Sequence, residues 1–193
     1  GSGIPTGTVT FKDGATTLGT VTLNGSGVAT ITTSALAAGS HSITTDYSGD
    51  STFDTSSTSI TQLVNLAPSI TSASSTTFVL GTAGSFQFAA DGFPAPTFST
   101  SQTLPSGLTL TSSGALSGTP AAGTSGTYTF TVTATNGVGA DSTQNFTLTI
   151  NEAPTITSAS GTTLSVGTSG TFAFTGTGFP APAFSLAGTL PAG

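Results

Sequence analysis

The chain repeats part of its own sequence. Residues 67–107 read APSITSASSTTFVLGTAGSFQFAADGFPAPTFSTSQTLPSG, and residues 153–193 read APTITSASGTTLSVGTSGTFAFTGTGFPAPAFSLAGTLPAG. The two stretches align without a gap, and their first residues, Ala67 and Ala153, are 86 positions apart. Self-similarity at a fixed spacing of this size is typical of tandem arrays of small domains. The chain is therefore predicted to contain one complete repeat and the beginning of another.

Within each repeat, apolar residues alternate with Thr and Ser in short runs separated by Gly, Pro and Asn. Alternation with period two predicts half-buried antiparallel strands, and no stretch favours a long helix. Asn136-Gly137 is predicted to be a tight connection between the last two strands. In the complete repeat we expect strands at 69–72, 77–80, 85–90, 97–100, 108–111, 115–118, 127–135 and 142–150. Their inward side chains would be Phe86, Phe88, Tyr128, Phe130, Val132, Ala134, Phe146, Leu148 and Ile150.

These features predict an all-β fold made of tandem immunoglobulin-like β-sandwich domains arranged end to end, with the first and last domains incomplete. The predicted boundaries are 1–65 for a domain that lacks its first strands, 66–151 for a complete domain and 152–193 for the first strands of a third. In the first domain, strands are expected at 8–11, 20–23, 28–33, 40–47 and 57–64. The short segments 65–68 and 151–154 are predicted to be stiff linkers.

Few residues of the chain are charged. Charged residues make up 4% of the sequence, against roughly 25% in an average globular domain. With one Lys and no Arg, the chain has almost nothing to neutralise phosphates, which argues against nucleic acids and anionic membrane surfaces as partners. No apolar run approaches the roughly 20 residues of a membrane span, and the first residues lack the pattern of a signal peptide. The absence of Cys excludes disulfide bonds.

Two segments resemble known families. GTVTFKDGATTLGTVTLNGSGVATITTSALAAGSHSITTDYSGDSTF is similar to the bacterial Ig-like group 3 repeat. LPSGLTLTSSGALSGTPAAGTSGTYTFTVTATNGVGADSTQNFTLTI is similar to the "putative-Ig", cadherin-like repeats of large secreted bacterial proteins. The resemblance implies an extracellular, non-catalytic domain of the kind used in stalks and adhesins and as an accessory to secreted enzymes.

His41 is the only histidine and the first candidate for chemistry. The run Gly39-Ser40-His41-Ser42-Ile43 matches Gly126-Thr127-Tyr128-Thr129-Phe130 position for position. Sandwiches often place a tyrosine corner at this point of the penultimate strand, so His41 and Tyr128 are predicted to be structural corner residues that bind the backbone. No G-x-S-x-G elbow occurs, and Glu152 is the only Glu, so neither a Ser-His-Asp triad nor a glycosidase carboxylate pair is expected. The chain is predicted not to be an enzyme and to need no cofactor.

Calcium is the remaining metal to consider. Cadherin-like domains hold Ca²⁺ at their junctions with Asp, Asn and Glu oxygens, and the resemblance suggests Asn65, Asp91, Asn136 and Asp141 as weak candidates. At the next junction Thr177 replaces Asp91, so the ligand set is not repeated, and solvated turn residues are the alternative. Asp46, Asp50 and Asp54 recur at every fourth residue, a spacing that favours turn chemistry over a calcium loop.

The sequence Gly-Phe-Pro-Ala-Pro recurs beside each linker. We expect Phe93 and Pro94, and likewise Phe179 and Pro180, to pack with Leu66 as interdomain joint residues; a sugar-stacking platform is the alternative. Lys12 is predicted to point outward, which argues against an isopeptide cross-link. Asn24 and Asn145 fit the N-glycosylation pattern, and so charge-poor a surface is expected to be covered by glycan or by protein.

These observations lead to three hypotheses of function. The first is a structural segment of a large secreted or cell-surface bacterial protein, acting as a rigid spacer or adhesin scaffold. The second is a subunit of a homopolymeric extracellular filament, in which the strands of 155–187 complete the opening domain of the next chain. The third is a carbohydrate-binding accessory domain of a secreted hydrolase, for which the aromatic residues offer little support. Neighbouring domains of the same chain are the expected partners.

Overall fold

The computed structural model describes residues 3–189, which form strands, turns and loops. Within that range, no helix has the length and apolarity needed to cross a membrane. The chain divides into two compact units. The first contains residues up to Pro68 together with Asp91–Pro96 and Asn136–Ala140, and the second contains Ser69–Ala90, Thr97–Thr135 and the chain from Asp141 onward. Each unit is described by itself.

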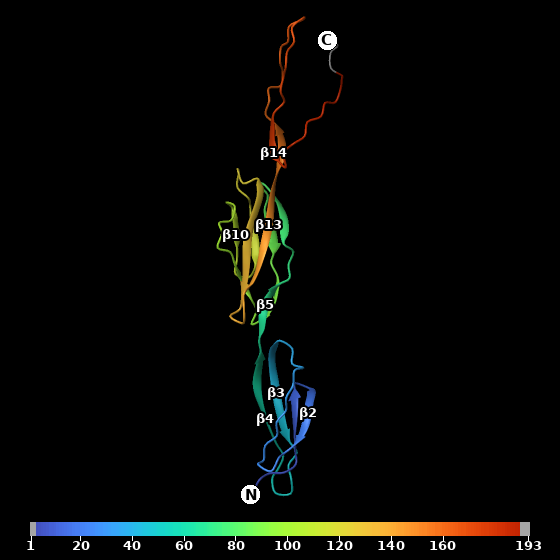
Figure 1. Ribbon diagram of the computed structural model, residues 1–193, viewed down its shortest axis with the longest axis vertical. Coiled ribbons are helices and arrows are strands. Elements are labelled where there is room, and N and C mark those ends of the chain that lie inside the picture. Colours follow the sequence, from blue (N-terminus) through green and yellow to red (C-terminus); the bar gives the residue numbers. More distant parts are fainter. Residues whose placement is uncertain (1–2, 190–193) are drawn as a thin grey trace. The chain divides into compact units, whose positions relative to one another are not determined.

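The first domain is a single sheet of four antiparallel strands (Figure 1). Strand order in the sheet is β2-β1-β3-β4. The hairpin of β3 and β4 pairs in unbroken register from Gly39 opposite Val64 to Tyr47 opposite Ser56. The bounds are β1 (Thr8–Asp13), β2 (Thr16–Thr22), β3 (Gly39–Tyr47) and β4 (Ser56–Val64). Side chains along β4 are mostly exposed, because no second sheet of this domain covers them among the residues described.

The second domain has two sheets that enclose a core. One sheet has the order β10-β11-β7, and the other has the order β9-β12-β13, with β6 added in parallel to the far edge of β13. β5 pairs with β8. The bounds are β5 (Leu66–Ile70), β6 (Ser75–Val79), β7 (Gly84–Gln87), β8 (Ala90–Phe93), β9 (Thr97–Ser99), β10 (Leu108–Leu110), β11 (Ala115–Gly118), β12 (Gly126–Thr135) and β13 (Ser142–Ile156).

The core of the second domain is built from the inward faces of both sheets. The Phe146 ring lies 4.7 Å from the Phe88 ring, 4.9 Å from that of Phe86 and 5.5 Å from that of Phe130, centroid to centroid. The alternation therefore predicted part of this core correctly, although Phe86 and Tyr128 lie only half-buried at its border. The prediction did not include four further buried residues, Phe78, Phe98, Leu108 and Leu116. The buried members are Phe78, Phe88, Phe98, Leu108, Leu116, Phe130, Val132, Ala134, Phe146, Leu148 and Ile150.

The predicted linkers are largely strand, which corrects the prediction. β5 already begins at Leu66, so only Asn65 separates it from β4. β13 continues through 151–154 to Ile156, where it pairs with β14 (Gly176–Phe179). Both segments lie between a predicted last strand and a predicted first one, and the Pro in each is compatible with a strand at a sheet edge. Pairing with β8 and with β14, both distant in sequence, recruits these residues into sheets.

Two further predictions of local structure are wrong. The strand expected at 85–90 is split into β7 and β8, because the chain changes its partner: β7 pairs with β11, and β8 pairs with β5. The Phe88 amide still donates to the Gly114 carbonyl (2.8 Å), just beyond the end of β7. Asn136-Gly137 is not a tight hairpin turn, since the β12–β13 ladder ends at Ala134 opposite Ser142. The longer loop between them directs the Asn136 side chain to partners outside the hairpin.

Residues 28–33 form no strand, contrary to prediction. The turn before them is the same as the turn before β11: the Asn24 amide donates to the Val28 carbonyl (3.0 Å), as the Thr111 amide donates to that of Ala115 (2.9 Å). Segment 28–33 is thus the counterpart of β11. β11 is a strand because it pairs with β7, and residues 28–33 have no pairing strand among the residues described.

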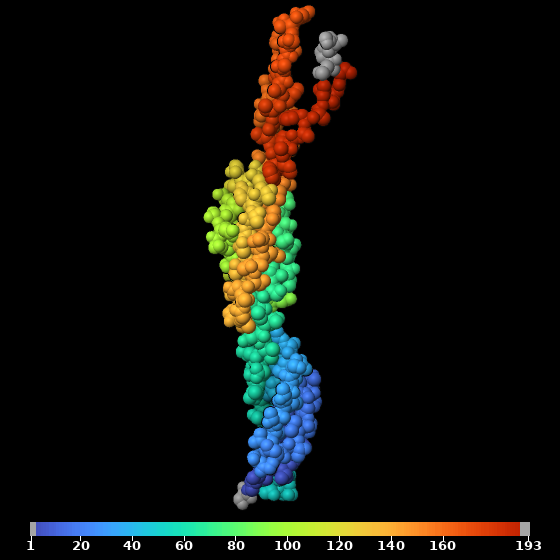
Figure 2. Space-filling view, viewed as in Figure 1, coloured from blue at the N-terminus to red at the C-terminus, as the bar shows by residue number. Residues whose placement is uncertain are grey.

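The chain after the second domain, residues 152–189, is called the third segment. Its one strand besides the end of β13 is β14. In the space-filling view this segment, coloured orange to red, is a thin ribbon of atoms without a second layer (Figure 2). Its apolar side chains are accordingly exposed, including Leu164, Val166, Phe174, Phe184 and Leu186.

Candidate functional site

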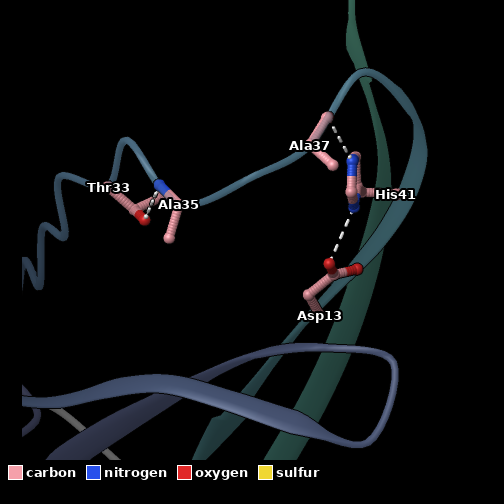
Figure 3. Close-up of polar contacts among 5 residues, drawn as sticks. All are labelled: Asp13, Thr33, Ala35, Ala37 and His41. Atoms are coloured by element: carbon pink, nitrogen blue, oxygen red, sulfur yellow. Dashed lines mark hydrogen bonds and ion pairs between the residues drawn. The ribbon is translucent and has the colours of Figure 1, made fainter.

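His41 lies on β3 with both ring nitrogens bonded (Figure 3). Nδ1 is 2.7 Å from Oδ2 of Asp13, and Nε2 is 2.8 Å from the carbonyl oxygen of Ala37. Two acceptors suit a doubly protonated imidazolium, which donates from both nitrogens. The hydrogen bonds to the Ala37 carbonyl and to the Asp13 carboxylate raise the pKa of His41 above 6.5, and the bond to Ala37 has the larger effect.

The His41–Asp13 pair has the form of two members of a catalytic triad, but its outer nitrogen is occupied. In a triad, Nε2 must face the nucleophile hydroxyl in order to take its proton. Here Nε2 faces a backbone carbonyl, which has no proton to give. The geometry therefore supports anchoring of the loop before β3 rather than nucleophile activation.

Tyr128 makes the corresponding contact in the second domain. Its hydroxyl donates to the Thr124 carbonyl, four residues upstream, at 3.0 Å, just as His41 bonds the carbonyl of Ala37, four residues upstream. The two residues also occupy matching positions in matching hairpins, since His41 lies opposite Gln62 and Tyr128 opposite Leu148. Each side chain anchors the loop that precedes its strand by a hydrogen bond to the loop backbone.

Asp46 and Asp50, two of the three regularly spaced Asp residues, have different environments, and the third, Asp54, is exposed. Asp50 accepts hydrogen bonds from the amides of Thr6 (2.7 Å), Thr52 (2.7 Å) and Phe53 (2.8 Å). These amides hold the pKa of Asp50 far below 3.8, so Asp50 is a turn residue that also ties down the chain at Thr6. Asp46 is not in a turn but on β3. The Lys12 ammonium, 2.7 Å away, and the Ser57 hydroxyl lower the pKa of Asp46.

Asn136 binds two other stretches of backbone at once. Its Nδ2 donates to the Leu66 carbonyl and to the Pro94 carbonyl, both at 2.8 Å, while its Oδ1 accepts the amide of Val138 (3.1 Å). One side chain thereby ties the start of β5, the Gly-Phe-Pro-Ala-Pro loop and the loop after β12 to one another. This contact is called the Asn136 clamp.

Of the predicted joint residues, Leu66 and Pro94 take part in the clamp, whereas Phe179 lies on β14, opposite Glu152. Phe93 and Phe179 are half-buried, whereas Leu66, Pro94 and Pro180 are exposed. Phe93-Pro94 and Phe179-Pro180 are both cis peptide bonds. Gly92 has a φ of 147°, and a Cβ there would lie 3.0 Å from Nδ2 of Asn136 and 3.3 Å from Cα of Pro68. The close approach of these segments therefore requires glycine at this position.

The four calcium candidates do not share one environment. Asn136 uses its oxygen for the amide of Val138, and Asn65, Asp91 and Asp141 are exposed. Within residues 3–189, no group of three or more His, Asp and Glu side chains lies together in a way that could hold a metal ion. Glu152, at the repeat position of Leu66, accepts a hydrogen bond from the Ser125 hydroxyl at 2.8 Å.

Both predicted glycosylation positions are exposed. Asn24 accepts the amides of Ser26 (2.9 Å) and Val28 (3.0 Å) through its Oδ1. Asn145 lies on β13, where its Oδ1 accepts the Thr131 hydroxyl at 3.1 Å.

Sequence reasoning missed two features. It named Asn136 as a turn residue and as a candidate metal ligand, and it did not foresee the donor role of the amide group, which depends on carbonyls 70 and 42 residues away. It also missed the open face of the first domain, where a groove of about 610 Å³ is lined by residues such as Phe11, Ile43 and Ile60. The available signal for this groove was the prediction that the first domain lacks its first strands.

Two family models match the chain. Residues 1–65 match the family described as "Bacterial Ig-like domain (group 3)". Residues 67–151 match the family described as "Putative Ig domain". Domains of these families are typically non-catalytic. No curated protein matches the sequence significantly.

Among solved structures, Dpr2 Ig1–Ig2 in complex with DIP-Theta Ig1–Ig3 is similar with a TM-score of 0.50 and 15% identity, covering 78% of this chain and 59% of that one. Dscam1 isoform 4.44, N-terminal four Ig domains, has a TM-score of 0.47 and 17% identity over 91% of this chain and 54% of its own. A putative alpha-galactosidase from Bacteroides fragilis has a TM-score of 0.39 and 29% identity over 44% of this chain. This chain spans 17% of that galactosidase structure. The first similarity indicates the immunoglobulin fold and nothing finer.

Proposed function

This chain belongs to the group 3 bacterial Ig-like domains through residues 1–65 and to the family described as "Putative Ig domain" through residues 67–151; from this premise, we propose that it is a stiff spacer of a larger extracellular bacterial protein. Domains of these families typically lie outside the cell or at its surface. The spacer acts by geometry: it holds whatever precedes and follows it at a set separation.

The observation that carries the proposal is the near absence of linker between domains. A flexible linker needs several residues free of secondary structure. Only Asn65 lies between β4 and β5, and β13 passes from the second domain into the third segment without a break. Chain that is held in a ladder has lost the backbone freedom on which hinge motion depends.

The Asn136 clamp adds a second restraint. Rotation of the backbone at Leu66 would break the hydrogen bond from Nδ2 of Asn136, and movement of the neighbouring loop would break the one to Pro94. Each such bond contributes roughly 0.5–1.5 kcal/mol. Two bonds from one side chain are therefore enough to keep an open joint at the level of a few per cent.

The test is the spread of distances between spin labels on the two domains. The chain has no Cys, so Thr16→Cys on β2 and Thr109→Cys on β10, both at exposed positions, would be the only labelling sites. We expect one narrow distance distribution in pulsed electron spin resonance, and a broader one after Asn136→Ala. Asn145→Ala, which removes an exposed amide side chain that takes no part in the clamp, is the matched control and should leave the distribution narrow.

A broad distribution in the unmodified chain would overturn the spacer proposal. A narrow distribution that Asn136→Ala leaves unchanged would retain the stiff spacer but remove the clamp as its cause. Folding of each variant is checked first by circular dichroism, so that broadening is not confused with unfolding.

A further inference from the structure

The first domain has an apolar face that its own described residues leave open. The groove of about 610 Å³ lies between this face of the sheet and residues 31–36. Its apolar lining includes Phe11, Leu18, Ile31, Leu36, Ile43 and Ile60, and the Ile60 side chain is 62% exposed. None of the lining residues is charged.

The second domain shows what covers such a face. The β3–β4 hairpin and the β12–β13 hairpin have the same register, in which Ile43 lies opposite Ile60 and Phe130 opposite Phe146. Ile60 is therefore the counterpart of Phe146, which is fully buried. Phe86 and Phe88, whose rings lie 4.9 Å and 4.7 Å from that of Phe146, cover it from the opposite sheet.

The third segment carries a second set of these covering side chains. Phe172 and Phe174 are the repeat counterparts of Phe86 and Phe88. Their rings lie 5.0 Å apart at an interplanar angle of 83°, much like the 4.9 Å and 75° of the first pair. Whereas Phe88 is 2% exposed, Phe174 is 59% exposed. Among the residues described, no second sheet packs against Phe172 and Phe174.

Backbone pairing is complementary in the same way. In the second domain, β11 pairs with β7, so that Ser117 lies opposite Ser85. The counterparts of these two strands are residues 28–31 in the first domain and residues 170–173 in the third segment, and neither is a strand. Each has the backbone groups that the other would need to form a ladder.

The outer edge of β4 is a second place at which the first domain lacks a pairing strand among the residues described. β13 is flanked by β6, which pairs in parallel with Thr147–Asn151. β4 is the counterpart of β13 but the last strand of its sheet. The counterpart of β6 is residues 161–165 of the third segment, which are not in a strand. Within residues 3–189, the first domain thus has two places without a pairing strand, the edge of β4 and residues 28–31. The third segment contains the counterparts of the strands that pair at these places in the second domain: residues 161–165 correspond to β6 and residues 170–173 to β7.

We propose that the first domain of one copy of this chain accepts the third segment of a second copy. Residues 161–165 add in parallel to the edge of β4. Residues 170–173 pair with residues 28–31, and the chain from 170 to 175 places Phe172 and Phe174 over the groove. Residues 153–189 contain no charged residue, and none lines the groove, so no charge is desolvated when residues 161–175 bind there. This association is separate from the spacer function and does not depend on it.

One element limits how far the donated segment extends. In the first domain, β1 pairs with β3, so that Val9 lies opposite Tyr47. In the second domain, β9 occupies the corresponding place beside β12, where Phe98 lies opposite Ala134. The counterpart of β9 in the third segment, residues 183–185, would compete with β1 for this place. The donated chain must therefore leave the groove after Gly176, near the repeated Phe-Pro.

The test is disulfide trapping between copies. Thr30 and Thr171 are both exposed and are the counterparts of Ser117 and Ser85, which face each other on β11 and β7. Opposed Cα atoms of an antiparallel pair are about 4.5–5.5 Å apart, a distance that a disulfide bridges. A Thr30→Cys chain mixed with a Thr171→Cys chain should give a covalent heterodimer on mild oxidation. The control pair, Thr16→Cys with Thr171→Cys, should not.

The double variant Thr30→Cys/Thr171→Cys distinguishes two routes to closure. Copy-to-copy association predicts a ladder of covalent dimers, trimers and longer chains on a non-reducing gel. An intrachain disulfide in a monomer would overturn the proposal, because one chain would then cover its own groove. Equal trapping of the test and control pairs, or no trapping at high protein concentration, would also overturn it.

A side-chain substitution tests the groove without any cross-link. Phe174→Asp changes a residue that is already exposed, so the free chain should fold as before. It should raise the concentration of half-maximal association in sedimentation velocity at least about tenfold. The free energy gained by burying one Phe side chain is larger than the free energy that corresponds to a tenfold change in affinity. Ala173→Asp, on the other face of the same segment by alternation, should raise it much less. Equal effects of the two variants would contradict the placement of Phe174 in the groove.

Discussion

Phe88→Ala and Phe174→Ala remove the same side chain from two copies of the same repeat, so any difference between them comes from what surrounds the ring. Phe88 is 2% exposed, and its ring lies 4.9 Å from Phe86, 4.7 Å from Phe146 and 6.1 Å from Phe98. Truncation of a buried Phe costs about 3–5 kcal/mol, because apolar burial is lost and a cavity remains. With three ring neighbours, we expect the upper half of that range for Phe88.

For Phe174→Ala we expect a change within about 0.5 kcal/mol at concentrations where the chain is monomeric, because the ring is already 59% exposed. Equilibrium unfolding in urea measures both variants. Tyr128 is the only tyrosine of the second domain, so its fluorescence in a Tyr47→Phe background reports that domain. A loss below about 1.5 kcal/mol for Phe88→Ala, or equal losses for the two variants, would refute the assignment of one complete core and one uncovered repeat.

The other predictions concern the corner residues and Asp50. The pKa of His41 is raised in the folded chain, so its charge stabilises the first domain fully below pH 6.5 and progressively less as pH rises through the folded-state pKa. The urea midpoint should therefore decline between about pH 5 and about pH 9 in the unmodified chain and stay constant in His41→Gln. The lowered pKa of Asp50 predicts the opposite sign: stability is present above pH 3.8 and lost as pH falls below it, and Asp50→Asn should abolish this acid-dependent loss when thermal melting is followed at decreasing pH. Tyr128→Phe should cost the second domain about 1 kcal/mol, since it removes one hydrogen bond to the Thr124 carbonyl; an unchanged urea midpoint would rule out that contribution.

Local patterns were sufficient to predict the parts of the fold that depend on one strand at a time. The alternation along β12 and β13 identified Phe130, Val132, Phe146 and Leu148 as inward, and all four are buried. Period-two patterning reports directly on which face of a strand meets the core. The match between the His41 and Tyr128 segments likewise needed only a comparison of the chain with itself.

Features that depend on distant partners could not be predicted in the same way. Nothing near Leu66 or Glu152 in sequence indicates that these residues join β5 and β13, because the strands that pair there are β8 and β14. Residues 28–33 have the sequence of a strand but form none, because strand formation requires a neighbour as well as a propensity. The clamp at Asn136 depends on carbonyls that only the folded chain brings within 2.8 Å.

The most direct test of the account is whether the first and second domains tumble as one body. Amide residual dipolar couplings are measured on the unmodified chain at a concentration at which sedimentation shows only monomers, and an alignment tensor is fitted to each domain separately. The stiff spacer predicts two tensors of the same magnitude and rhombicity, with one orientation that reproduces both sets of couplings. A clearly smaller tensor magnitude for one domain would mean independent motion about Asn65 and would contradict the account.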